Sequence, residues 1–335
     1  MKKILVTGAG GFIGGYIVEK ALKENFETFA GVRKTTSREF LQDERIKFID
    51  IPFNDKDKLN AFLKKCKSEF GGWDIVIYNL GVTKCLDERD FERINYGFSR
   101  NFVDGLVEND LVPSQFIMMS SLSALGPGDE INMTPITCDD NPTPNTAYGR
   151  SKLKAENYIK SIDNFPYVFM RPTGVYGPHD KDYLLMVKTI KAGFDFVAGY
   201  KPQRITFIYV KDLVDCIFSV IKKGVVQKEY IVSEEADYSS SQFREYVQKE
   251  LNKKFVIPVR VPLFILNVIA NVSSIISKAT GKPTALNRDK YNIMKQRNWR
   301  CDITPLKDEL NFIPAYSLKD GVKETIAWYK ENKWI

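Results

Sequence analysis

The chain opens with Lys2-Lys3-Ile4-Leu5-Val6-Thr7-Gly8-Ala9-Gly10-Gly11-Phe12-Ile13-Gly14, an apolar strand that runs through a glycine-rich turn into a helix. In this layout Gly8 permits a tight turn, Gly11 lets the backbone approach a pyrophosphate, and Gly14 lets the helix pack against the sheet. Free N–H groups and the helix dipole favour phosphate at the helix N-terminus. Glycines also collect in purely structural turns, so the pattern alone leaves both interpretations open.

The composition is that of a globular protein large enough for one big domain with a smaller lobe. The 335 residues are 44% hydrophobic and 27% charged. The net charge of +7, from 49 basic and 42 acidic residues, is spread without long blocks of one sign. It indicates a weak attraction for small anionic ligands and argues against a nucleic-acid partner.

Several features bear on location and on metal binding. Five scattered cysteines match neither a zinc pair nor a disulfide framework, which indicates a reducing compartment. The first strand begins so early that no leader fits before it, so we expect a cytoplasmic protein. The single histidine, His179, argues against a metal site and against a Ser-His-Asp triad.

The most apolar stretch of the chain is Val261–Ile276, which is short and interrupted by Asn and Ser. It is therefore not expected to be an integral membrane segment. A buried or lid helix is the favoured interpretation, and a peripheral membrane contact is the alternative.

Strand-like and helix-like segments alternate through the first half, which predicts an α/β fold with a Rossmann-type, doubly wound parallel sheet. We assign residues 1–176 plus about 205–233 to a dinucleotide-binding domain. Residues 177–204 plus about 234–335, where prolines interrupt the alternation, should form a smaller C-terminal substrate lobe. The expected strands are 3–6, 27–32, 47–51, 75–78, 115–120 and 167–171, and the expected helices lie near 15–23, 58–67, 91–108 and 148–160.

Two motifs of the first half offer acid-base chemistry. Tyr148 and Lys152 lie one turn apart on one face of a predicted helix. A free tyrosine has a pKa of about 10, so it needs a nearby cation, which Lys152 can provide, to act as a base at neutral pH. The preceding strand ends in Ser120 and Ser121, at the sheet edge where open α/β folds bind ligands. A serine hydroxyl there can polarise a carbonyl, or simply cap the strand.

In this order the motifs resemble the extended branch of the short-chain dehydrogenase/reductase superfamily, which includes the NAD-dependent epimerase/dehydratase family and dihydroflavonol reductase-like members. That branch carries TGxxGxxG, a Ser-Ser pair, YxxxK and RPxxVYGP. The chain matches them with Thr7–Gly14, Ser120-Ser121, Tyr148–Lys152 and Arg171–Pro178. Residues 207–213 look like a later strand-to-helix segment of the family, with Tyr209 where many relatives have histidine.

The resemblance implies a set of site residues. Ser121, five residues before Gly126, corresponds to the catalytic hydroxyl, Tyr148 and Lys152 to the acid-base pair, and Asn95 to the asparagine that supports the lysine. Ser123 and Arg204 are substrate-side candidates. The cofactor-binding candidates are Gly8, Gly11, Phe12, Ile13, Gly14, Arg33, Lys34, Asp50, Ile51, Leu80, Gly81, Tyr148, Lys152, Pro172 and Val175.

The end of the second strand predicts which dinucleotide is bound. A carboxylate there would hold a ribose 2′-hydroxyl and repel a 2′-phosphate. The chain instead has Arg33 and Lys34, and a guanidinium suits phosphate. We therefore expect NADP to be preferred over NAD, with a solvated basic turn as the structural alternative.

Three functions follow as alternatives. The first is hydride transfer at a secondary alcohol or ketone carbon of a nucleotide sugar, by an epimerase or dehydratase, with which basic residues such as Lys201 and Arg204 agree. The second is an NADPH-dependent ketone or aldehyde reductase, favoured by Arg33 and the stretch Val261–Ile276. The third is a cofactor-binding regulator without turnover. The resemblance also suggests a homodimer.

Overall fold

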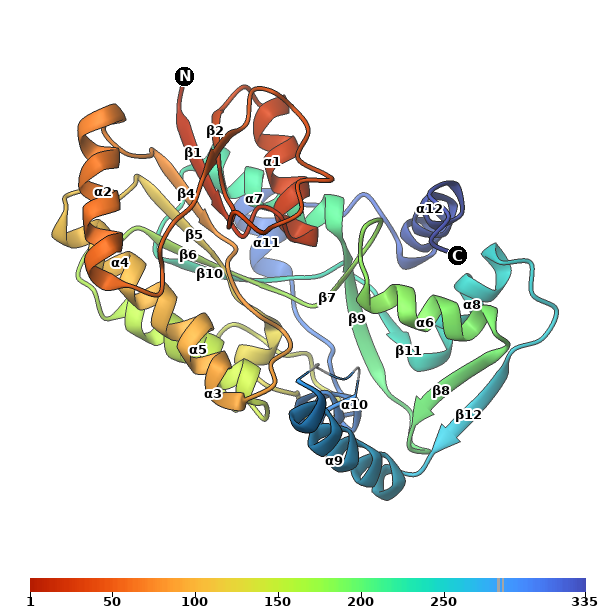
Figure 1. Ribbon diagram of the computed structural model, residues 1–335. Helices are drawn as coiled ribbons and strands as arrows, with labels where there is room; N and C mark the ends of the chain where they lie inside the picture. The colour runs from red at the N-terminus through yellow and green to blue at the C-terminus, as the bar shows by residue number, and fades with distance from the viewer. Residues whose placement is uncertain (282–283, 285) are drawn as a thin grey trace. The chain divides into compact units, whose positions relative to one another are not determined.

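The computed structural model in Figure 1 describes residues 1–281, 284 and 286–335, which form two compact units. The first unit comprises Met1–Ala124, Ala147–Arg171 and Val214–Tyr230. The second comprises Leu125–Thr146, Pro172–Leu213 and Ile231–Ile335. These limits differ from the predicted domain boundaries, because the segments 125–146 and 205–213 cluster with the second unit.

The first unit is built on a sheet with the strand order β10-β6-β5-β4-β1-β2-β3 in the described chain. All pairs between β3 and β6 are parallel, and the strand order reverses at β1, which pairs with both β2 and β4. The predicted Rossmann-type sheet is thereby confirmed, and its carboxyl edge beside β1 is the place where such folds bind ligands. The strands are β1 (Lys3–Thr7), β2 (Glu27–Gly31), β3 (Lys47–Ile49), β4 (Ile75–Tyr78), β5 (Gln115–Met119), β6 (Tyr167–Pro172) and β10 (Lys228–Val232).

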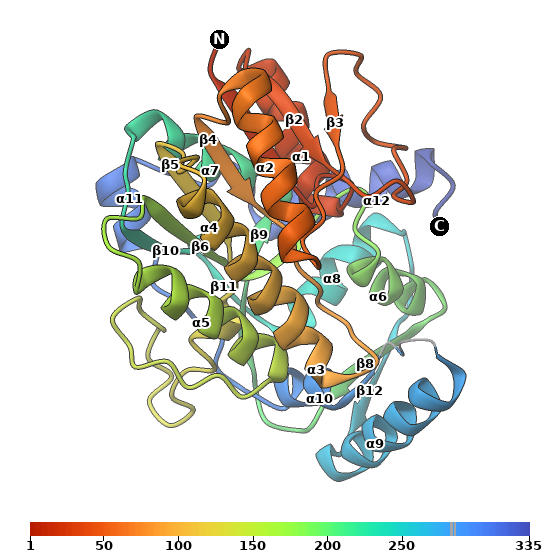
Figure 2. The same cartoon turned by 60° about the vertical axis from the view of Figure 1, so that its left-hand side comes forward.

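Helices pack on both faces of this sheet, which explains why its central strands are apolar throughout. α2, α4 and α5 cover one face (Figures 1 and 2), where Leu63, Phe102 and Ile159 share a buried cluster with Val76 and Phe116 of the strands. The helices of the unit are α1 (Phe12–Lys23), α2 (Lys56–Phe70), α3 (Glu88–Phe91), the π-helical turn η1 (Glu92–Gly97), α4 (Phe98–Glu108), the 3₁₀ turn η2 (Leu122–Ala124), α5 (Ala147–Lys160) and most of α7 (Val210–Lys223).

The second unit has an aromatic core and two small sheets in its described part, ordered β11-β9-β7 and β12-β8. Tyr176, Phe207 and Phe243 pack in its core with Tyr329 of the last helix. Its strands are β7 (Gly174–Tyr176), β8 (Phe194–Ala198), β9 (Arg204–Tyr209), β11 (Asp237–Ser239) and β12 (Ile257–Val261), and its helices are α6 (Asp182–Lys191), α8 (Ser240–Glu250), α9 (Leu263–Thr280), α10 (Arg288–Met294), α11 (Thr304–Leu310) and α12 (Leu318–Glu331).

α9 contains the apolar stretch that the sequence singles out. The expected burial of this helix is wrong for most of its length, because the apolar side chains from Phe264 to Ile276 are largely exposed, apart from Leu266 and Ala270. In the described chain no helix has the length and hydrophobicity needed to span a bilayer.

The glycine turn behaves as its sequence predicts. Gly8 has a φ of 63°, a left-handed conformation that glycine adopts without strain. A Cβ on Gly14 would lie 2.2 Å from the carbonyl oxygen of Gly8, so only glycine lets α1 begin this close to the turn.

We predict that Gly14→Ala lowers the free energy of unfolding by about 1–3 kcal/mol, the usual cost of overpacking, because backbone atoms must move. Gly15→Ala is the matched control, since its Cβ would meet only the Phe40 Cβ at 3.9 Å. That variant should be neutral or up to about 1 kcal/mol more stable, as alanine suits a helix better. Denaturant unfolding measures both, and equal stability of the two variants would contradict the packing argument.

Candidate functional site

The N-terminus of α1 is arranged to receive an anion. Its N-cap is Gly11, no side chain of the described residues caps it, and its first turn carries no acidic residue. The first N–H groups of the helix, including those of Phe12 and Ile13, therefore point toward the turn without a side-chain acceptor. These features fit the pyrophosphate of a dinucleotide.

The turn is fastened to the end of β4. The Thr7 hydroxyl accepts hydrogen bonds from the N–H groups of Asn79 and Leu80, each at 3.1 Å. A Cβ on Gly8 would lie 2.7 Å from the Asn79 carbonyl oxygen. Leu80 and Gly81, both predicted to bind the cofactor, thus lie directly after β4, where it ends beside its parallel neighbour β1. Sequence inspection missed Thr7 in this role, although it is the residue before Gly8 in the glycine motif.

The predicted specificity residues lie at the ends of β2 and β3. Arg33 and Lys34 are exposed, and the Arg33 carbonyl oxygen accepts a hydrogen bond from the Thr36 N–H at 2.9 Å. The Thr36 methyl group packs on the glycine turn, because a Cβ on Gly10 would lie 2.2 Å from it. This contact brings the basic loop next to the turn.

Behind that loop, Asp50 is exposed and Ile51 is buried. Arg38, a further cation of the same loop, stacks on the Phe48 ring with its guanidinium carbon 4.1 Å from the ring centroid. No carboxylate follows Glu27 before residue 39, so nothing at the end of β2 would repel a 2′-phosphate.

Ser121 and Tyr148 meet at the carboxyl edge of the same sheet. The Ser121 oxygen accepts a hydrogen bond from the Ser123 N–H at 3.2 Å, which orients it, and Ser121 is hydrogen-bonded to the Tyr148 hydroxyl. Tyr148 is half-buried and packs edge-on against Phe91. Burial raises the pKa of Tyr148 to about 12, and the hydrogen bond with Ser121 counteracts part of that shift.

Lys152 is buried on the same helix as Tyr148, one turn further along α5. Its ammonium donates a hydrogen bond to the Met119 carbonyl oxygen at 2.8 Å and lies 5.9 Å from the centroid of the Tyr148 ring. Burial lowers the pKa of Lys152 to about 8, and the negative charge of Glu156 opposes this shift. Stabilisation of the Tyr148 phenolate by Lys152 stays a prediction, since burial is the largest cause acting on the Tyr148 pKa.

Asn95 holds the loop after β4 against α5. Its amide accepts a hydrogen bond from the Val82 N–H at 2.8 Å and donates to the Val82 carbonyl at 3.1 Å and to the Ser151 hydroxyl at 3.0 Å. Between them Gly81 is exposed, and a Cβ on it would lie 3.0 Å from the Lys152 nitrogen. Because Gly81 has no side chain, its backbone can pack close to the buried ammonium.

The backbone around Asn95 departs from the predicted continuous helix 91–108. Residues Glu92–Gly97 form a π-helical turn between α3 and α4. Such turns change which side of the helix a residue faces, and here Asn95 is fully buried within reach of α5. The resemblance predicts the role of Asn95, but nothing in the amino-acid pattern predicts the turn.

A buried ionic network surrounds Glu156, one turn after Lys152 on α5. This network was not predicted from the sequence. Glu156 accepts hydrogen bonds from Ser120 and from Arg171, whose Nε and Nη2 lie 3.1 and 2.6 Å from its two oxygens. Arg171 also pairs with Glu229. The spacing of Lys152 and Glu156, four residues apart on a helix, is the one sequence signal that indicates this network.

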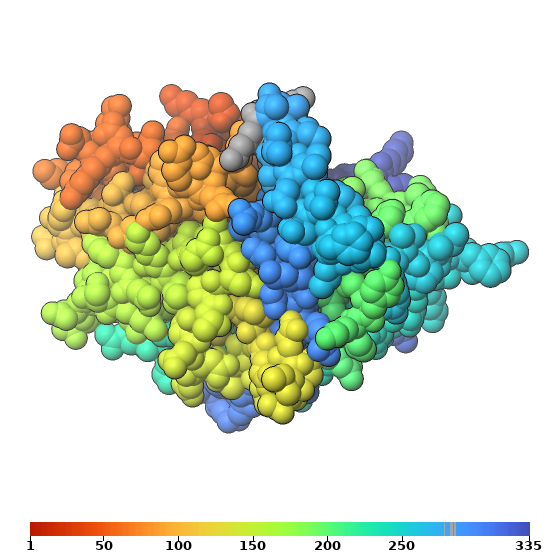
Figure 3. Space-filling view, turned by 90° about the horizontal axis from the view of Figure 1, so that it is seen from below, coloured from red at the N-terminus to blue at the C-terminus, as the bar shows by residue number. Residues whose placement is uncertain are grey.

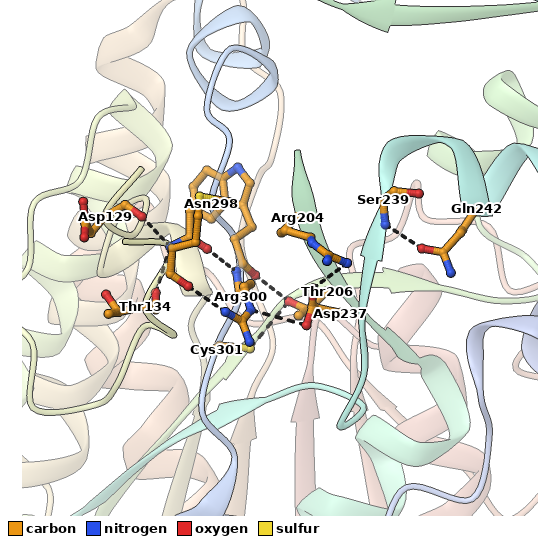
Figure 4. A network of polar contacts seen from close by, with 12 residues as sticks. Asp129, Thr134, Arg204, Thr206, Asp237, Ser239, Gln242, Asn298, Arg300 and Cys301 are labelled. Carbon is orange, nitrogen blue, oxygen red and sulfur yellow. Dashed lines mark hydrogen bonds and ion pairs between the residues drawn. The ribbon is translucent and has the colours of Figure 1, made fainter. Parts of the chain in front are cut away.

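The remaining predicted residues belong to the second unit. Pro172 ends β6, and Val175 lies opposite Ile208 in the pairing of β7 with β9. Arg204 pairs with Asp237 at 3.3 Å, and Arg300 contacts the other oxygen of that carboxylate at 3.3 Å (Figure 4). Two guanidinium groups therefore share one carboxylate.

The same network joins segments far apart in the sequence (Figure 4). The Asn298 side chain donates hydrogen bonds to the carbonyl oxygens of Asp129 and Thr134, both at 2.8 Å. These bonds connect the segment 125–146, which was predicted to belong to the cofactor domain, to the rest of the second unit.

Comparison with known proteins identifies the family to which this sequence is similar. Residues 4–233 match the model of the NAD dependent epimerase/dehydratase family. The chain is 23% identical to the UDP-glucose 4-epimerase of Vibrio cholerae, over 97% of this chain and 94% of that protein. It is 19% identical to the ceramide reductase of Caulobacter vibrioides, over 99% of this chain and 96% of that protein.

Among solved structures, the Bordetella bronchiseptica enzyme WbmG in complex with NAD and UDP is similar, with a TM-score of 0.77 and 18% identity over 99% of this chain and 96% of that chain. At this identity the likeness shows a shared fold.

We predict that Lys152→Met leaves the protein at least as stable as the wild type at pH 7. A lysine whose pKa falls from 10.5 to about 8 on folding destabilises the folded state below pH 8, at an upper limit on the order of 3 kcal/mol. The variant also loses the hydrogen bond to Met119, which reduces its expected gain in stability by about 1 kcal/mol. The unfolded state binds more protons between those two pH values, so the wild type should gain stability relative to the variant as the pH rises from 8 to 10.5.

Urea unfolding at several pH values measures this difference. Lys154→Met, which removes an exposed lysine of the same helix, should show no such pH dependence. A Lys152→Met variant that is much less stable at every pH would contradict the burial of an unfavourable charge.

Proposed function

The chain belongs to the NAD dependent epimerase/dehydratase family, and we propose that it transfers a hydride at a secondary alcohol or ketone carbon of a nucleotide sugar. It is an enzyme of the oxidoreductase type, as the members of its family are. The observation that carries the proposal is the grouping of Ser121, Tyr148 and Lys152 at the sheet edge that also holds the glycine turn.

The residues of the first unit suit a nicotinamide dinucleotide. The N-terminus of α1 would hold the pyrophosphate, and the exposed Gly81 would let the ligand approach Lys152, which we assign to the nicotinamide ribose. When bound, the nicotinamide supplies or accepts the hydride. The protein contributes position and proton transfer, and alignment of two bound reactants is itself a large part of catalysis.

Tyr148 would transfer the proton to and from the substrate oxygen. With a pKa raised to about 12 it is protonated at neutral pH, so in the reducing direction it can donate to the oxygen of the substrate carbonyl. The Ser121 hydroxyl, already fixed by the Ser123 N–H, would hydrogen-bond the same oxygen. In the oxidising direction the Tyr148 phenolate would accept the proton of the substrate hydroxyl. The positive charge of Lys152 would favour that phenolate.

The second unit supports a nucleotide sugar as substrate. Arg204 and Arg300 share the single carboxylate of Asp237, which leaves an excess positive charge suited to a diphosphate. The relative from Vibrio cholerae acts, by its name, on UDP-glucose. Ser123, two residues after Ser121 in the first unit, is a further substrate candidate.

A reductase of an apolar ketone is the second candidate. It is favoured by the exposed apolar side chains of α9 and by the similarity to a protein named ceramide reductase. The two candidates differ in the fate of the cofactor, which an epimerase regenerates in each turnover and a reductase consumes.

The predicted homodimer and the cytoplasmic location are part of the proposal. The dimer would form through the helices near 91–108 and 148–160, as the resemblance suggests. None of the five cysteines, all in the described part of the chain, is joined in a disulfide, which agrees with a reducing compartment.

We predict that Tyr148→Phe lowers kcat by 10²- to 10⁴-fold, the typical contribution of general acid-base catalysis, while dinucleotide binding persists. Tyr158→Phe is the matched control, because Tyr158 lies on the same helix and its hydroxyl bonds Asp104 away from Ser121. The assay offers UDP-glucose and other nucleotide sugars, and follows both sugar product and NAD(P)H absorbance.

A changed sugar without net cofactor turnover identifies an epimerase or dehydratase, and stoichiometric NADPH oxidation with a ketone identifies the reductase. Full activity of Tyr148→Phe would overturn the catalytic assignment and favour a cofactor-binding regulator.

We also predict that the wild type binds NADP more tightly than NAD. Arg33→Asp should weaken NADP binding by about 10- to 100-fold, the effect of losing one charged hydrogen bond of about 1.5–3 kcal/mol, and leave NAD binding unchanged or improved. Arg45→Asp is the control, since that exposed arginine is paired with Asp43. Calorimetric titration measures all three proteins, and equal wild-type affinity for the two dinucleotides would contradict the assignment of Arg33.

A further inference from the structure

The second unit carries a large exposed apolar surface, here named the α9 surface, made by α9 together with β8 and β12. On α9 alone, eight large apolar side chains are more than a third exposed. Soluble proteins seldom leave such contiguous patches open to water. The eight are Leu263, Phe264, Ile265, Val268, Ile269, Val272, Ile275 and Ile276.

The two faces of α9 are the reverse of those expected for a helix in water. Its buried positions include Leu266, Ala270 and Ser277, which are mostly small or polar. Its outward positions carry the largest apolar groups, with Phe264 71% and Ile275 68% exposed. A helix that only covered a protein core would bury these side chains. The outer face of α9 is therefore suited to an apolar environment.

The segment that holds β8 and β12 adjoins α9 (Figures 1 and 3). Phe194 and Phe196, two residues apart on β8, are both exposed and stack with ring centroids 6.5 Å apart. Ile257 of β12 is exposed beside them, as β12 pairs with β8. Tyr200, whose carbonyl oxygen accepts a hydrogen bond from Arg260, is also exposed. Aromatic side chains next to a basic residue are typical of a membrane interface.

The stretch of chain that carries β12, α9 and α10 is strongly basic. Residues 251–300 contain ten basic residues and one acidic residue, a net charge of +9, whereas the whole chain has 49 and 42, a net charge of +7. The other residues thus have 39 basic against 41 acidic groups and a net charge of −2. Exposed Arg288 and Lys290 lie on α10, which packs against α9. The partner of the surface should therefore be both apolar and anionic.

We propose that the α9 surface docks on an anionic lipid bilayer, with α9 in the plane of the interface. Such helices bury an apolar face at the boundary of headgroups and acyl chains, and flanking cations attract anionic lipids. Because no helix of the described residues could cross the bilayer, the contact is peripheral. A second copy of the chain fits less well, since a symmetric contact would bring two strongly basic segments together. The proposal does not depend on the reaction proposed above.

Flotation with lipid vesicles tests the proposal on the full-length protein. We expect binding to vesicles of phosphatidylcholine with 30% phosphatidylglycerol at least tenfold stronger than to phosphatidylcholine alone, and weakened at least tenfold by the double variant Val268→Asn/Ile275→Asn. The control is Ile131→Asn/Ile313→Asn, which changes two exposed apolar residues outside the surface and should bind like the wild type. Circular dichroism verifies that all variants fold.

Two further measurements keep the test decisive if the α9 variant fails to fold. Binding of the wild type should fall at least tenfold between 50 and 500 mM salt, and Arg288→Gln/Lys290→Gln should weaken it without loss of structure. Failure of the wild type to float with anionic vesicles would overturn the proposal. So would an α9 variant that floats like the wild type, or one that only turns a dimer into a monomer in light scattering, which would assign the surface to a second copy.

Discussion

The candidate site depends on keeping one ammonium group, that of Lys152, out of water. Its charge is compensated by the Met119 carbonyl and by Glu156 one turn further along α5. Glu156 in turn is held by Arg171. Such an arrangement costs stability in the absence of ligand, and proteins retain costly buried charges chiefly where they serve a function. Because α5 also carries Tyr148, the same helix positions the proton donor and the charge that can tune it.

Much of this arrangement follows from the amino-acid pattern. The glycine spacing, the apolar strands and the four-residue separation of Tyr148 and Lys152 predict a parallel sheet with a polar site at its carboxyl edge, and the structure has that sheet. These features are predictable because they depend on local conformation and on a periodicity that each segment carries by itself.

Other parts of the site depend on contacts that no local pattern contains. The π-helical turn at Asn95 exists where the loop after β4 meets α5, and the hydrogen bond from Lys152 goes to a backbone carbonyl that is the same for every residue type. The burial of Glu156 on α5 needs Arg171, which comes from strand β6. The amino-acid composition of α9 does not predict its exposure either, since an apolar helix is buried in most soluble proteins.

The second unit combines two properties that bear on substrate choice. The Arg204–Asp237–Arg300 network offers positive charge, and the α9 surface offers apolar contact. They are joined through the chain that follows α9, because Gln203 beside Arg204 donates hydrogen bonds to the Met294 and Gln296 carbonyl oxygens at the end of α10.

Nitrogen-15 NMR of the lysine side chains, with the Lys152 signal assigned by its absence in a Lys152 variant, tests the central claim most directly. The account predicts that the Lys152 ammonium titrates near pH 8 in the free protein and that its signal shifts when NAD or NADP binds. A titration midpoint above pH 10, as for a lysine in water, would contradict this account. So would a Lys152 signal that does not shift when the dinucleotide is added.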